Sequence, residues 1–188
     1  MKLRLFGCLL GLLLATSAQA ASFEFGLNDS SAQLRLGQAL RSDELGQTLL
    51  QFRGLYSDQE ETKLGSLGLE FVGEPGNVLG LEVGVGANAY LGKTHRGRDF
   101  FNLALGLQVT YVPPFLGGLG FGGRLAYAPE VLSFIESESL VESAAQVSYA
   151  VTPKARVFVE YQNIRNEFER RGNWTIDDAV RLGFQTRF

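Results

Sequence analysis

The sequence predicts an all-β protein: a small antiparallel, transmembrane up-and-down β-barrel of about ten strands. Three observations lead to this fold class. The chain of 188 residues begins with a segment that has the anatomy of a secretory signal. Most of the remainder alternates apolar and polar residues with a period of two, which is the period of a β-strand. The final segment is a strand of this kind that ends in Phe188.

The first twenty residues have the three parts of a secretory signal peptide. Lys2 and Arg4 give a positive start, and an apolar run follows over 5–15. The run closes with AQA at 18–20, a small-residue cleavage site. The apolar run is too short to cross a bilayer as a helix. The sequence therefore predicts a cleaved signal peptide over 1–20.

Cys8 gives an alternative interpretation of this start, because LFGC at 5–8 resembles a lipoprotein signal. In such a signal the apolar run precedes the Cys, whereas here most of the run follows it. Cleavage after Ala20 is favoured, and it leaves a barrel domain over 21–188 without Cys, which excludes disulfides and Cys-ligated metals. Two of the 17 basic residues and none of the 20 acidic ones are removed, so the formal charge becomes −5. A negative net charge argues against binding to nucleic acid, which requires a basic surface.

Two long segments carry the clearest alternation. Over 78–91, Leu, Val and Ala occupy every second position, and mostly Gly, Glu, Asn and Tyr stand between them. Over 100–112 the pattern repeats, with Phe, Leu, Val and Tyr alternating with Asn, Ala, Gly, Gln and Thr. A helical period would put Glu82 and Gln108 on the apolar stripe, so it fits neither segment. Both segments exceed the roughly 9–11 residues that a tilted strand needs to cross a membrane.

Eight further segments alternate less regularly, which gives an even number of strands, as is usual for bacterial barrels. The ten predicted strands are 22–28, 32–40, 48–56, 64–72, 78–91, 100–112, 119–128, 140–151, 155–164 and 176–188. If the first two are not part of the wall, eight remain. The turns expected on the periplasmic side, with the N-terminus, are 74–77, 113–118 and 152–154. The longer loops expected outside are 92–99, 129–139 and 165–175.

The last predicted strand is the most specific signal of the barrel class. Phe188 shares a face with Phe184, Leu182 and Val180, while Arg, Gly and Gln stand between them. An alternating final strand that ends in Phe resembles the signature recognised by the barrel-assembly machinery. Phe184 and Phe188 are therefore predicted as the assembly signal, although Thr186 stands where a larger apolar residue is common. Tyr residues near strand ends on the apolar faces fit the aromatic girdles of membrane barrels.

With the signal, the Gly-rich strands and the terminal Phe, the chain resembles the YfaZ family of outer-membrane proteins over essentially its whole length. The most distinctive segment is GFGGRLAYAPEVLS at 120–133, a Gly-rich strand that runs into an Ala-Pro loop. The resemblance implies a porin-like barrel in the outer membrane of a Gram-negative bacterium. It implies no established activity and supplies no site residues.

If the apolar faces meet lipid, the opposite faces line the lumen and carry both signs of charge. The predicted lumen charge network consists of Glu24, Arg35, Arg53, Glu70, Glu82, Arg124, Glu142, Arg156, Glu160, Arg181 and Arg187. Buried charges have to pair, because an unpaired one costs several kcal/mol. Arg–Glu ladders are therefore expected to plug most of a barrel this narrow. The alternative is a narrow polar conduit, for which Gly residues on the same faces would leave space.

Motifs for catalysis or cofactors are weak. The run GLGFGG matches the dinucleotide pattern GxGxxG, but a strand follows it where that site needs a helix. No cofactor and no metal site are predicted, since the chain has one His, His95, and no Cys after the signal. An enzyme at the outer rim would have to combine His95 with a nearby acid or nucleophile, and nothing in the sequence places one beside it. The candidates are Asp99, Ser133, Glu136 and Glu138.

The sequence favours a non-enzymatic barrel, either structural or a narrow conduit for small solutes. A lipid-modifying or proteolytic barrel enzyme and a surface-loop interaction protein are the alternative functions, and a secreted soluble β-sandwich is the alternative fold. The expected partners are outer-membrane lipid, lipopolysaccharide and, during biogenesis, the barrel-assembly machinery. Lys93, Arg96 and Arg98 could pair with lipopolysaccharide phosphates.

Overall fold

The computed structural model describes residues 21–76, 78–94, 99–168 and 172–188, and the predicted signal peptide lies outside these ranges. All described strands belong to one antiparallel sheet. They are β1 (Ala21–Leu27), β2 (Ser31–Asp43), β3 (Gly46–Ser57), β4 (Thr62–Gly73), β5 (Leu81–Lys93), β6 (Asp99–Tyr111), β7 (Leu119–Ala128), β8 (Ser133–Ile135), β9 (Ser137–Thr152), β10 (Ala155–Phe168) and β11 (Gly172–Arg187).

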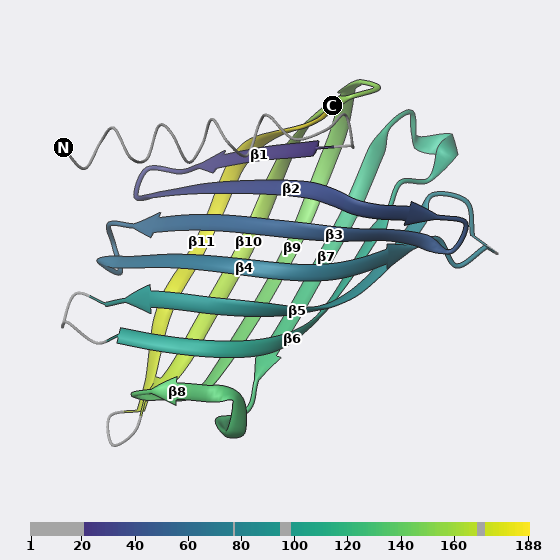
Figure 1. Cartoon of the computed structure of the whole chain (residues 1–188). Coiled ribbons are helices and arrows are strands. Elements are labelled where there is room, and N and C mark those ends of the chain that lie inside the picture. Colours follow the sequence, from purple (N-terminus) through teal and green to yellow (C-terminus); the bar gives the residue numbers. More distant parts are fainter. Residues whose placement is uncertain (1–20, 77, 95–98, 169–171) are drawn as a thin grey trace, which may run out of the picture.

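Ten of these strands close into a barrel. Each pairs with its neighbour along the chain, β1 pairs with β11, and β5 pairs with β6, so these ten strands leave no open edge. At the closure, the carbonyl of Ala21 accepts a hydrogen bond from the backbone N–H of Phe188 at 2.9 Å. In Figure 1, β1–β6 form the near wall, and β7 and β9–β11 form the wall behind it. The predicted up-and-down barrel of ten strands is confirmed.

The barrel has two ends, which are named here by what lies at each. The terminal end carries Ala21 and Phe188, together with the turns that join β2 to β3, β4 to β5, β6 to β7 and β9 to β10. The hairpin end carries the connections β1 to β2, β3 to β4, β5 to β6, β7 through β8 to β9, and β10 to β11. The turns that were predicted to share a side with the N-terminus all lie at the terminal end.

The outward face of the wall is apolar on every barrel strand. Leu105 on β6 and Leu182 on β11 are 66% and 69% exposed, although both lie in the middle of long strands. Tyr56, Tyr127 and Tyr149 share this outward face near strand ends, whereas Tyr161, predicted near a strand end, lies in the middle of β10. An apolar band around a closed barrel, with Tyr near the strand ends, is the surface that a bilayer requires. The fold is a transmembrane β-barrel.

The short β8 strand was not predicted. β7 pairs with only the second half of β6, from Leu105 to Tyr111, and ends at Ala128. A single 3-10 turn at Glu130–Leu132 then leads into β8, which pairs with Phe100–Asn102 at the start of β6. Three residues without alternation give no periodic signal. This strand supplies partners to the part of β6 that β7 does not reach.

The loops at the hairpin end are shorter than predicted. The segment 165–175, expected to be a loop, is mostly strand, because β10 continues to Phe168 and β11 begins at Gly172. Similarly, β9 begins at Ser137 inside the loop expected over 129–139. In contrast, β5 begins three residues later than predicted, at Leu81. Among the described residues, no helix is long and apolar enough to cross a membrane.

Candidate functional site: a closed lumen and a polar vestibule

A carboxylate lies at the centre of the closed part of the lumen. Glu142 on β9 is fully buried and accepts hydrogen bonds from two strands across the lumen, β3 and β5, and from the adjacent strand β10. Both terminal nitrogens of Arg53 donate to its two oxygens, at 2.6 and 2.8 Å. The hydroxyl of Tyr90 donates at 2.6 Å, and Nε2 of Gln162 donates at 2.9 Å. This bidentate, fully partnered arrangement compensates the burial of both charges.

A second cluster joins β1, β2 and β10. Arg35 donates from Nη1 and Nη2 to the two oxygens of Glu160, at 2.8 and 3.1 Å. Nη1 also donates to Glu24 at 2.5 Å, and Gln33 donates to Glu160 at 3.1 Å. One guanidinium therefore holds two carboxylates, one on an adjacent strand and one across the lumen.

A third cluster surrounds Arg181 on β11, whose side chain is fully buried. It forms an ion pair with Asp177 on the same strand, and it donates to Gln162 at 3.0 Å and to Ser31 at 2.9 Å. Because Gln162 also donates to Glu142, it links this cluster to the first. The three clusters together are called the charge network below, and their charged members are Glu24, Arg35, Arg53, Glu142, Glu160, Asp177 and Arg181.

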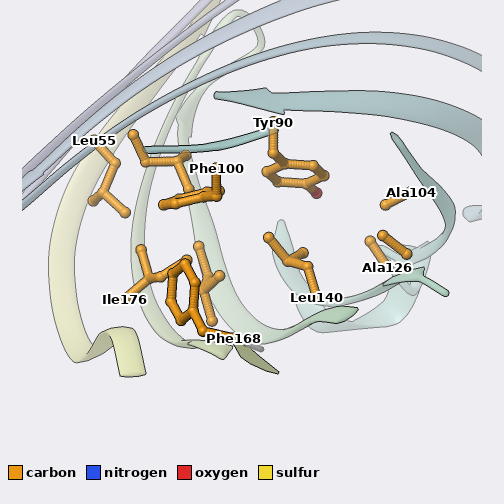
Figure 2. Close-up of a cluster of buried hydrophobic side chains, with 11 residues drawn as sticks. Leu55, Tyr90, Phe100, Ala104, Ala126, Leu140, Phe168 and Ile176 are labelled. Carbon is orange, nitrogen blue, oxygen red and sulfur yellow. The ribbon is translucent and has the colours of Figure 1, made fainter. Parts of the chain in front are cut away.

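An apolar layer covers the charge network toward the hairpin end. It consists of Leu55, Leu64, Tyr90, Phe100, Ala104, Ala126, Ala128, Leu140, Ile164, Phe168 and Ile176, with Trp174 packed against it. These side chains come from β3–β7 and β9–β11, and Figure 2 shows the labelled ones gathered inside the barrel. The rings of Phe100 and Phe168 meet edge to face, 6.2 Å apart. A Cβ at Gly92 would lie 2.1 Å from the Phe100 ring, so glycine is required there.

The terminal half of the lumen is open. A cavity of about 510 Å³ reaches from the charge network to the turns β2–β3, β4–β5 and β9–β10 at the terminal end, and it is called the vestibule below. Its wall carries mainly amide, hydroxyl and glycine residues between the charges, among them Gln108, Thr110, Gly122, Gln146, Ser148 and Gln185. The barrel therefore has the form of a cup, closed at the hairpin end and open at the terminal end.

The predicted lumen residues fall into two groups. Glu24, Arg35, Arg53, Glu142, Glu160 and Arg181 belong to the charge network. The others lie between that network and the terminal end. Glu70 accepts a hydrogen bond from Gln51 at 2.7 Å, and Arg124 approaches Glu142 only to 4.0 Å. Three line the vestibule and form no ion pair with a described residue: Glu82, Arg156 and Arg187.

Several members of the site were not predicted from the sequence. Asp177 shares its strand face with Arg181, so continued alternation from Arg181 would have found it. Ile176 could not be found in this way, because the register between β10 and β11 shifts at Ile164 and turns Ile176 inward beside Asp177. Tyr90 was placed on the polar face, but its role as a donor to Glu142 depends on a strand distant in sequence.

The residues considered for catalysis are separated or occupied. His95 lies outside the described residues. Asp99 forms an exposed ion pair with Lys93 at 3.6 Å, and the hydroxyl of Ser133 donates to the carbonyl of Pro129 at 3.0 Å. In the part of the chain that the structure describes, no group of three or more His, Cys, Asp and Glu side chains is placed to hold a metal ion. Arg96 and Arg98, considered for lipopolysaccharide contact, also lie outside the described residues.

Comparison with solved structures finds other barrels of similar size. The KdgM porin in complex with disordered oligogalacturonate is 12% identical, with a TM-score of 0.49, over 90% of this chain and 99% of that one. The outer-membrane protease OmpT from Escherichia coli is also 12% identical, with a TM-score of 0.48, over 90% of this chain and 93% of that one. The NanC porin is 10% identical, with a TM-score of 0.43, over 90% and 98%.

No curated protein matches the chain. The family described as YfaZ precursor does match, over residues 1–188, which is the whole chain. The Gly-rich strand β7 and the Ala-Pro turn that follows it, on which the resemblance to this family was based, form one side of the vestibule and the connection to β8. The protein belongs to the YfaZ family.

Proposed function

We propose that this protein is an outer-membrane barrel that does not conduct solutes: a structural barrel closed toward the outside and open toward the periplasm. The observation that carries the proposal is the charge network beneath the apolar layer. Arg53 and Tyr90 reach Glu142 across the lumen with hydrogen bonds of 2.6–2.8 Å. A hydrated ion would have to break these bonds and then pass an apolar layer, which favours the plug over the conduit.

The same proposal assigns no catalysis to the barrel. Two of the candidates among the described residues, Asp99 and Ser133, already pair with Lys93 and with a backbone carbonyl. A nucleophile engaged in this way is not beside a base that could activate it. The function of Phe184 and Phe188 as an assembly signal stays a prediction.

We expect the protein to carry no ionic current in a planar bilayer. Folded, inserted protein should give no discrete conductance steps over the range in which an open porin, tested in the same bilayer, conducts. Insertion is checked separately, by the heat-dependent gel mobility of the folded barrel. Reproducible steps from the wild-type barrel would contradict the proposal and restore the narrow conduit.

The proposed orientation has its own test, in which single cysteines are labelled on intact cells. Gln59 lies exposed in the β3–β4 turn at the hairpin end, and Glu74 lies exposed in the β4–β5 turn at the terminal end. We expect Gln59→Cys to react with a membrane-impermeant maleimide on intact cells, and Glu74→Cys to react only after the outer membrane is permeabilised. The wild-type chain, whose one Cys is Cys8, is the background control. The opposite labelling pattern would place the vestibule outside the cell.

A further inference from the structure

Outside the charge network, the charged residues that line the vestibule are sorted by sign to opposite walls. Its acidic residues outside the charge network come from β2–β5 and their turns: Asp43, Glu44, Glu74 and Glu82. Its basic residues outside the network come from β7–β11 and their turns: Arg124, Lys154, Arg156 and Arg187. These two sets of strands form facing walls of the barrel (Figure 1). A transverse electric field therefore crosses the vestibule.

The deeper charges of this set are not neutralised by the protein. Within the described residues, Glu82 has no side-chain hydrogen bond or ion pair. Arg156 donates only to neutral acceptors, the hydroxyl of Ser148 at 3.1 and 3.2 Å and the carbonyl of Gly118 at 2.9 Å. Nε of Arg124 is buried and has no hydrogen-bond partner there. Glu82 and Arg156 form no ion pair with a described residue, so both side chains can contact a ligand in the vestibule.

The shape and field of the vestibule select one class of ligand. Its volume of about 510 Å³ lies within the roughly 300–1,000 Å³ range of small-molecule sites. Charges in a cleft with low-dielectric walls act more strongly than the same charges on an open surface. A purely anionic or purely cationic solute is attracted by one wall and repelled by the other, whereas a solute with separated opposite charges is attracted by both. Amide and hydroxyl groups between the walls complement its polar middle.

We propose that the vestibule binds a small zwitterionic solute, of which a short peptide with free termini is the simplest example. Its carboxylate lies at the guanidinium group of Arg156, and its ammonium group lies at Glu82. Guanidinium groups are well suited to bind carboxylates, because they offer paired donors. This site adds a ligand class to the proposed function, and it requires only that the barrel is folded.

The test uses four forms of one peptide with the folded barrel in nonionic detergent micelles. Trialanine is a zwitterion, its N-acetyl form is an anion, its C-terminal amide is a cation, and the doubly blocked form is neutral. Binding is measured by saturation-transfer NMR on the peptide methyl groups. Trialanine is expected to bind with a Kd of about 1 mM. Each blocked form is expected to bind at least about fivefold more weakly, because it loses a charged hydrogen bond.

Two substitutions assign the two ends of the peptide. Glu82→Gln should weaken the binding of trialanine and of its amide, and it should not weaken the binding of the N-acetyl form. Arg156→Gln should weaken the binding of trialanine and of the N-acetyl form, and it should not weaken the binding of the amide. The matched controls are Arg165→Gln and Glu167→Gln, since both residues lie exposed on β10 near the hairpin end. Neither control should alter any of the four affinities.

Three outcomes would overturn the proposal: equal binding of the four peptide forms, indistinguishable effects of the two substitutions, or no binding even at about 50 mM. If Arg156→Gln fails to fold, the four peptides with the wild-type barrel and with Glu82→Gln still test the proposal. The Glu82→Gln variant is expected to fold, because Glu82 has no side-chain partner among the described residues to lose. Absence of binding would not affect the proposal that the barrel does not conduct solutes. Conductance steps would overturn that proposal without affecting this site.

Discussion

Replacing Arg53 with Met is expected to lower the free energy of unfolding by about 3–5 kcal/mol, the usual cost of removing one partner from a buried ion pair. Glu142 is fully buried, and Arg53 supplies two of its four hydrogen bonds. The variant leaves a carboxylate in the lumen with only neutral donors and a guanidinium, that of Arg124, at 4.0 Å. Urea titration of the barrel in lipid vesicles measures the loss. Fluorescence of the single Trp, Trp174, reports it, because its side chain packs against the apolar layer.

Two controls separate the lost pair from the lost side chain. In Arg53→Met/Glu142→Gln the residue left at position 142 is neutral, so most of the stability should return. Arg41→Met removes a guanidinium from an exposed pair with Asp43 at 3.3 Å, and exposed pairs contribute about 0–1 kcal/mol. If Arg53→Met costs no more than Arg41→Met, the charge network does not stabilise the barrel.

Replacing Leu182 with Arg is expected to cost about 2–4 kcal/mol in lipid, the cost of a charge on the lipid-facing side of a barrel near the bilayer midplane. Leu182 is 69% exposed in the middle of β11, between Leu27 on β1 and Val159 on β10. The same urea titration measures the change. In a water-soluble protein, a substitution at so exposed a position would change the free energy of unfolding by no more than about 0.5 kcal/mol.

Leu45→Arg is the matched control for this prediction. Leu45 is 80% exposed, but it lies in the β2–β3 turn at the terminal end. Charged substitutions near the interface cost about 0–1 kcal/mol. If Leu182→Arg and Leu45→Arg have equal, small effects, the apolar outer face does not meet lipid, and the interpretation of the fold as a transmembrane barrel is wrong.

The alternation of residues was sufficient to predict the wall of the barrel. Period two places Glu82 and Tyr90 on one face of β5 and Leu91 on the other, and the structure has them so. Strand ends were predicted less well, because pairing continues beyond the point at which alternation is clear. Arg165–Phe168 remain paired with β9 and β11 although this stretch was expected to be a loop.

The division of the lumen into a closed and an open half could not be predicted. Alternation gives the face on which a residue lies but not its partner across the lumen. Alternation with Arg53 and Glu70 places Leu55 and Leu64 on the inward face, but nothing local shows that they belong to an apolar layer that closes the lumen. Pairing of Arg53 with Glu142 joins positions 89 residues apart in sequence. Barrel closure and stagger bring such residues together, and both are properties of the whole sheet.

The cup-shaped lumen gives the two ends of one strand different freedom to change during evolution. On β10, Phe168 is buried in the apolar layer and Glu160 is held by Arg35, whereas Arg156 borders the vestibule. A substitution at the first two positions leaves a void or an unpaired charge, and it is removed by selection for a folded protein. A substitution at Arg156 alters a surface that water can fill. The closed half can therefore maintain the fold while the open half acquires new ligand preferences.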